Sequence, residues 1–196
     1  FFINPGIQIP QLITYITGIK DSDLKTAVTF AEKKTEIENF IGNFPIIGHN
    51  IEFDINFLKE NGIAITNPFY DTYELAAILL PNLPSYSLEI LSHKLNLKHE
   101  EKHRALDDSI AAMELFQKLT ETFQNLDPGL IEEIKILSQK SDWHLRNFIT
   151  TLMPDKNKIK KSRSTPVLDK NSVMENFLQI LETKNSTLFK KTTPYD

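Results

Sequence analysis

Residues 48–54 (GHNIEFD) place an imidazole, an amide and two carboxylates within seven positions. They follow a short apolar run, residues 44–48 (FPIIG), which is typical of a strand buried on both faces of a sheet. In open α/β sheets, ligands and catalytic groups collect at the carboxyl ends of strands. His49, Asn50 and Asp54 are therefore candidate site residues, with Asp54 in the first turn of the helix that follows. The alternative is that Asn50 caps this helix and Asp54 interacts favourably with the helix dipole.

A second cluster, residues 103–108 (HRALDD), leads into a long amphipathic segment. His103 lies just before the expected helix and Asp108 lies inside it, so both side chains can face one crevice. A carboxylate there can hold a divalent metal ion, and an imidazole that titrates near neutral pH can accept a proton from water. The alternative is a capping pair of aspartates, Asp107 and Asp108, beside a solvated histidine.

The elements that must position these residues are mostly helical. Apolar spacing predicts helices over residues 33–43, 73–80, 88–97 and 105–123, and another after residue 50. Ser87 is expected to cap the helix over residues 88–97. In that last helix Phe53, Phe57 and Leu58 form an apolar stripe, which we expect to face the sheet. Residues 44–48 and 69–72 read as strands. The pattern indicates an α/β fold, although one clear strand is too few for a sheet.

Composition excludes several classes of protein. The 196 residues contain no cysteine, which excludes a disulfide scaffold, a zinc finger and a thiol nucleophile. There is no apolar run of about eighteen residues and no signal-peptide pattern, so we expect a cytoplasmic protein without a membrane partner. The chain does not begin with methionine, and we expect it to be a fragment of a longer protein.

The charge is unevenly distributed. Residues 1–150 carry 13 basic and 21 acidic side chains, a net charge of −8, whereas residues 151–196 carry a net charge of +4. An acidic main domain does not hold nucleic acid by bulk electrostatics. If it acts on a polyanion, it does so through a local site, and metal ions there would offset the repulsion.

Taken together and in this order, the motifs resemble the DEDD-type (DEDDh, DnaQ-like) 3′–5′ exonucleases, the proofreading family of the epsilon subunit of bacterial replicative polymerase. The resemblance runs from Phe1 to Phe123. Besides the two clusters, it includes residues 4–10 (NPGIQIP) with 17–19 (TGI), residues 71–76 (DTYELA), and the helix over 88–97. It implies a ribonuclease-H-like fold, in which a mixed sheet is flanked by helices. It also implies roles for three residues, His103 as the base and Asp54 and Asp108 as metal ligands. We expect Asn50, His49 and Arg104 to contact substrate, with a helix-entry role for His49 and a surface contact for Arg104 as the alternatives.

The resemblance also implies a reaction and exposes a gap. The family hydrolyses the terminal phosphodiester at a 3′ end, with four carboxylates holding two Mg²⁺ or Mn²⁺ ions roughly 3.5–4 Å apart. The family's first motif, an Asp-x-Glu on the first strand, has no counterpart here, so we expect it upstream of Phe1. Asp54 and Asp108 alone would bind Mg²⁺ weakly, because that ion gives up its waters reluctantly. We therefore expect little activity from this polypeptide by itself.

The domain organisation and partners follow from the same comparison. We expect an incomplete exonuclease domain over residues 1–124, a helical extension over 125–153, a basic linker over 154–171, and the start of a further segment over 172–196. The expected partner is the 3′ end of nucleic acid, single-stranded DNA in preference to RNA, with a polymerase or a fused helicase of the DinG type as a further partner. Two alternatives stay open, namely an RNA-directed exonuclease of the same superfamily and a non-catalytic nucleic-acid-binding module.

Overall fold

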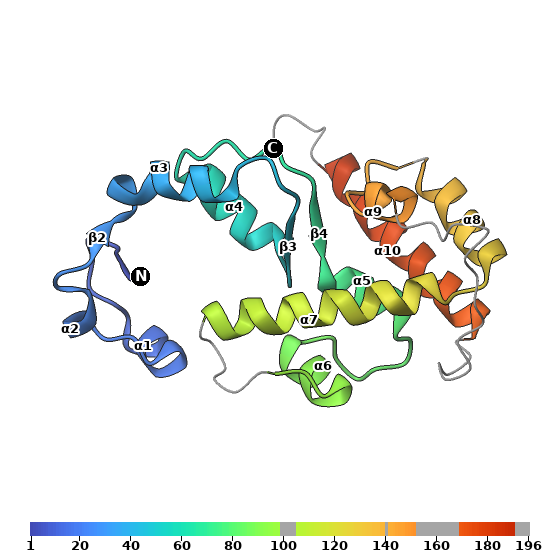
Figure 1. Cartoon of the computed structure of the whole chain (residues 1–196), viewed down its shortest axis with the longest axis horizontal. Coiled ribbons are helices and arrows are strands. Elements are labelled where there is room, and N and C mark those ends of the chain that lie inside the picture. Colours follow the sequence, from blue (N-terminus) through green and yellow to red (C-terminus); the bar gives the residue numbers. More distant parts are fainter. Residues whose placement is uncertain (99–104, 140, 152–168, 191–196) are drawn as a thin grey trace.

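The computed structural model describes residues 1–98, 105–139, 141–151 and 169–190, with side chains of the last range as far as Lys184. Figure 1 shows a narrow N-terminal part, a central strand pair crossed by one long helix, and a helical group beyond it. The N-terminal part comprises β1 (Ile3–Asn4), α1 (Gln11–Thr17), α2 (Asp21–Leu24), β2 (Val28–Thr29) and α3 (Phe30–Ile41). The central part comprises β3 (Ile46–Gly48), α4 (Glu52–Glu60), β4 (Phe69–Asp71), α5 (Thr72–Leu79), α6 (Leu88–Leu95) and α7 (Ala105–Gln124). The C-terminal group comprises α8 (Pro128–Ser138), α9 (Arg146–Thr151) and α10 (Lys170–Lys190).

The strands form two parallel pairs. β1 pairs with β2, and β3 pairs with β4 so that Ile46 lies opposite Phe69 and Gly48 opposite Asp71. Because β3 and β4 run in the same direction, their carboxyl ends meet at one edge, and the residues that follow each strand become neighbours. The α/β class expected from the sequence is confirmed. Over the described ranges the pairing is parallel throughout, and the mixed sheet stays a prediction.

A large apolar core joins α5, α7 and the C-terminal helices. Its fully buried side chains include Leu75 on α5, Leu115 and Phe123 on α7, and Ile131 on α8. Helix α10 contributes to the same core through a stripe spaced four residues apart, at Val173, Phe177 and Leu181. This spacing places the three side chains on one face of α10, which therefore packs against α5 and α8.

A second, smaller core lies under α4. It is made of Ile51, Ile55, Ile63 and Ile65, with Phe30 among the partly buried side chains packed against it. These residues hold α4 against α3 and the start of β4, apart from the main core.

The apolar stripe predicted for α4 is confirmed at Leu58, which packs against the small core, and was wrong for its two phenylalanines. Phe53 is 77% exposed and Phe57 is 49% exposed, and the buried residue of this helix is Ile55. Strand β3 was likewise expected to be buried on both faces, yet Ile47 is 40% exposed. Within the described residues β3 pairs with one strand, β4.

Helix ends follow ordinary capping chemistry. Ser87 caps α6 as predicted, its hydroxyl accepting the Ile90 N–H. Thr29 and Glu32 form a reciprocal capping box at the start of α3. Among the described residues, no helix is both long and apolar enough to cross a membrane.

The position of α10 in the main core can be tested by truncating one side chain. Phe177 is fully buried, so Phe177→Ala should lower the free energy of unfolding by about 3–5 kcal/mol, measured by urea denaturation. The neighbouring Leu178 is 41% exposed, and Leu178→Ala should cost only about 0.5 kcal/mol. Equal small losses in both variants would mean that α10 is not part of the cooperative core.

Candidate active site

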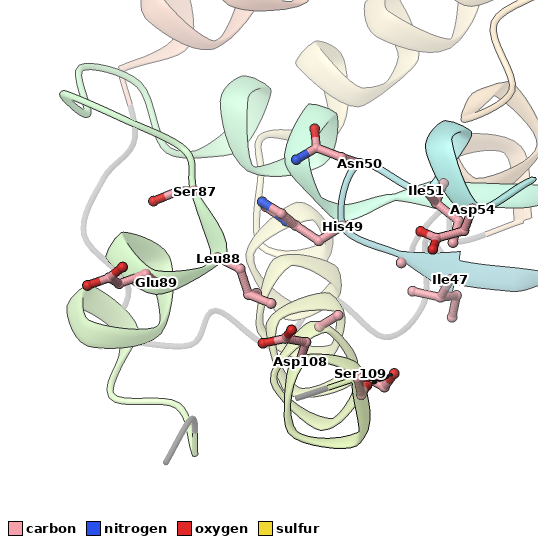
Figure 2. Close-up of a pocket in the computed structure, with 13 residues that line it drawn as sticks. Ile47, His49, Asn50, Ile51, Asp54, Ser87, Leu88, Glu89, Asp108 and Ser109 are labelled. Carbon is pink, nitrogen blue, oxygen red and sulfur yellow. Dashed lines mark hydrogen bonds between the residues drawn. The ribbon is translucent and has the colours of Figure 1, made fainter. Parts of the chain in front are cut away.

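A pocket of about 570 Å³ opens where β3 ends. It is lined from three directions, by the loop and helix that follow β3, by the first turn of α6 and by the first turns of α7. Figure 2 shows Asp108 on α7, His49 on the loop above it, and Asp54 on α4. The polar residues that line it include Asp54, Asp108, His49, Asn50, Ser87 and Glu89.

The two predicted metal ligands line this one pocket. Asp54 lies in the first turn of α4 and Asp108 in the first turn of α7. Burial of the carboxyl group raises the pKa of Asp54, so its carboxylate gains from a nearby cation. Asp107 is half-buried, and it is not among the residues that line the pocket.

The buried carboxylate of Asp71 holds the loop that carries His49 and Asn50. Its Oδ1 accepts the N–H of Asn50 at 3.0 Å and that of Tyr73 at 2.8 Å, and its Oδ2 accepts the N–H of Ile51 at 3.2 Å. Burial raises the pKa of Asp71 to about 6, against the opposing effect of these hydrogen bonds. The side chain is 5% exposed, so at neutral pH a buried anion ties β4 to the residues after β3.

His49 is oriented by a short hydrogen-bonded chain. Its Nδ1 lies 3.0 Å from Thr72 Oγ1, and the Thr72 hydroxyl donates to the Gly48 carbonyl at 3.1 Å. Burial lowers the pKa of His49 to about 4, which keeps the ring neutral at physiological pH.

Asn50 does not cap α4 as the alternative interpretation had it. The capping position is Ile51, without a side-chain cap, and Asn50 has a left-handed backbone with φ of 56°. Asparagine tolerates this conformation better than most residues. Asp71 accepts the N–H groups of Asn50 and Ile51, which precede α4, and so fixes the chain where it enters the helix. Gly48 is also required here, because a Cβ at that position would lie 2.4 Å from Ile51 Cδ1.

Sequence reasoning missed three residues of this site. Asp71 was noted only as part of residues 71–76, which resemble a segment of the exonuclease family. An acid at the end of a strand that pairs with β3 indicates a contact with the loop after β3. Ser87 and Glu89 line the pocket at the start of α6, and Ser87 was predicted only as a cap. Two predicted residues, His103 and Arg104, lie outside the described residues.

A second group of potential metal ligands lies away from the pocket. Glu52, Glu74 and His144 each offer an atom within 4.8 Å of the others. The Lys184 ammonium lies 2.8 Å from Glu52 Oε1 and 2.6 Å from Glu74 Oε1, so this group already holds a cation of the chain itself.

Comparisons with known proteins agree with the site. A family model described as an exonuclease, RNase_T, matches residues 1–116, and the chain belongs to this family. This confirms the resemblance to DnaQ-like exonucleases. The family generally uses divalent metal ions.

Three relatives illustrate where such domains occur. The chain is 32% identical over 147 residues, 71% of its length, to a DNA polymerase III PolC-type protein of Clostridium perfringens, of which it spans 10%. It is 29% identical over 143 residues, 70% of its length, to the 3′-5′ exonuclease DinG of Bacillus subtilis, of which it spans 15%. It is 32% identical over 123 residues, 60% of its length, to a DNA polymerase III subunit epsilon-like protein of Rhodobacter capsulatus, of which it spans 18%.

Asp71 and His49 contribute opposite pH dependences to stability. The pKa of Asp71 is about 6 against an ordinary value of 3.8, so its stabilising contribution is complete below pH ~3.8 and is lost as pH rises through ~6. The pKa of His49 is about 4 against 6.5, so its contribution is complete above pH ~6.5 and is lost as pH falls through ~4.

Two substitutions separate these contributions. The free energy of unfolding of the native chain minus that of Asp71→Asn should increase by up to about 3 kcal/mol as pH falls from ~7 to ~4. The same difference taken with His49→Gln should decrease by a similar amount over this pH range. Urea unfolding at several pH values measures both differences, and a change of both in the same direction would contradict the two pKa shifts.

Proposed function

We propose that this chain forms most of a metal-dependent 3′–5′ exonuclease domain that hydrolyses terminal phosphodiesters of DNA and releases nucleoside monophosphates. The observation that carries the proposal is the convergence of Asp54 and Asp108 on one pocket within the region that matches the exonuclease family. The two carboxylates come from different helices and lie 54 positions apart in the sequence, so the fold brings them to the same cavity.

The donors in the pocket suit Mg²⁺ or Mn²⁺. Both are hard cations that prefer carboxylate oxygens, which Asp54 and Asp108 supply. The raised pKa of Asp54 also favours a cation here, because a positive charge would stabilise the ionised carboxylate. When bound, two such ions supply an activated water and stabilise the leaving oxygen.

The remaining roles fall to side chains around this pair. By family resemblance, His103 accepts the proton of the attacking water, and Arg104 contacts phosphate. His49 and Asn50, on the loop held by Asp71, line the same pocket and would contact the substrate there.

The metal site needs further acids. Asp54 and Asp108 are two of the four carboxylates that such a site requires in this family, and the 196 residues contain no Asp-x-Glu pair for the other two. The 196-residue chain should therefore show little nuclease activity, and a chain extended at its N-terminus by a strand that carries such a pair should be active. Digestion of a 3′-labelled single strand with Mg²⁺ measures this, and strong EDTA-sensitive digestion by the 196 residues alone would contradict it.

The two metal ligands can be tested in the extended chain. Asp54→Asn and Asp108→Asn should each lower the rate of 3′ digestion by about 10²–10³-fold, because each removes a group that holds the charge-stabilising ions. Asp107→Asn is the matched control, since it removes a neighbouring carboxylate that does not line the pocket. If Asp107→Asn lowers activity as much as Asp108→Asn does, the assignment of the ligand is wrong.

The choice of nucleic acid is proposed from the relatives. Two of them are described as DNA polymerase III proteins and one as a 3′-5′ exonuclease, which favours a DNA substrate. The extended chain should digest a single-stranded DNA oligomer faster than the RNA oligomer of the same sequence. A preference for RNA would support the RNA-directed alternative, and binding without digestion of either would support a binding module.

A further inference from the structure

Helix α10 is anchored along most of its length. Near its start, Lys170 Nζ lies 3.0 Å from Asp127 Oδ1, the capping residue of α8. Its middle is buried at Val173 and Phe177, and Asn176 Nδ2 donates to the Ala77 carbonyl at 2.7 Å. These contacts fix the orientation of α10 ahead of Lys184, which lies three residues after Leu181, the last buried residue of the stripe.

Lys184 lies between two carboxylates from different helices. Its ammonium donates to Glu52 Oε1 on α4, and it contacts Glu74 Oε1 on α5. Glu74 is only 6% exposed, and its other oxygen accepts the Trp143 Nε1–H at 2.9 Å and lies 3.3 Å from His144 Nε2. The two carboxylates raise the pKa of Lys184 against the effect of burial. A buried carboxylate needs such partners, so the Lys184–Glu74 contact is a structural requirement.

The contact with Glu52 has a different consequence. Glu52 is the first residue of α4, two positions before Asp54, and its side chain is half exposed. The apolar contacts of α4 belong to the small core around Ile55, whereas α10 belongs to the main core. The Glu52–Lys184 ion pair therefore joins the helix that carries Asp54 directly to the C-terminal helical group.

We propose that Lys184 is a positioning residue, which fixes the first turn of α4, and with it the Asp54 carboxylate, to α10 by bridging Glu52 and Glu74. The catalytic consequence rests on the proposed function of Asp54. The positioning itself does not, since it follows from the contacts of Lys184. Lys184 lies beyond residues 1–116, whereas Glu52 and Glu74 lie within them, so α10 adds a support to the site from outside the matched exonuclease region.

Backbone amide hydrogen exchange on the 196-residue chain tests the positioning without any nuclease assay. Glu52→Gln breaks the link to α4 while Lys184 keeps its contact with the buried Glu74, so the main core stays intact. Exchange in residues 53–57 should rise about two- to fivefold, as expected for the loss of one partly exposed ion pair. Glu52→Asp keeps the negative charge at the start of α4 but shortens its reach, and it should give the same increase. Lys184→Arg keeps the bridge and should leave the exchange unchanged.

A control variant breaks the ion pair near the other end of α10. Lys170→Met removes the contact with Asp127 and should change exchange only near the starts of α8 and α10. Unchanged exchange in α4 of Glu52→Gln would overturn the proposal. It would also be overturned if Lys170→Met loosened α4 to the same extent, because α4 would then respond to any disturbance of α10.

Mn²⁺ affinity separates this proposal from the proposed function. In the extended chain, Glu52→Asp, which leaves the local charge unchanged, should weaken Mn²⁺ binding about two- to fivefold, and Lys184→Arg should not weaken it. If Mn²⁺ binds the extended chain and its Glu52→Asp variant equally well, the positioning of Asp54 is refuted. If the extended chain binds no Mn²⁺, the proposed function fails, and the exchange experiment still decides whether Lys184 positions α4.

Discussion

The buried carboxylate of Asp71 is the interaction on which the site depends. Parallel pairing of β3 and β4 places Asp71 opposite Gly48, and its two oxygens then accept the first two backbone N–H groups of the loop after His49. The same carboxylate caps α5, so one side chain sets the end of β4, the start of a buried helix and the path of the loop. The next residue, Thr72, orients His49. The pocket is thus built from strand register and backbone hydrogen bonds before any side chain contacts a substrate.

Two cores of unequal size explain how the pocket is supported. The helices α5 and α7 share the main core, and this fixes Asp108. Asp54 stands on α4, whose small core is separate. The two proposed ligands therefore lie on different packing units, which the strand pair, the Asp71 hydrogen bonds and the contact between Glu52 and Lys184 connect.

Much of this was predictable because it is local. Periodicity located the helices, Ser87 was recognised as a cap, and the two motifs that carry Asp54 and Asp108 pointed to one crevice. The exposure of Phe53 and Phe57 was not predictable, since an apolar stripe does not say whether a sheet covers it. The same limit applies to Asp71 and Lys184, whose roles depend on partners 20 or more positions away, and sequence periodicity carries no signal for such contacts.

The central claim is that Asp54 and Asp108 hold a divalent cation together. The most direct test is anomalous diffraction from crystals of this chain soaked in Mn²⁺, because it locates the ion without requiring turnover. The account predicts a manganese peak in the pocket within coordinating distance of both carboxylates. A peak among Glu52, Glu74 and His144 with none between Asp54 and Asp108 would contradict it.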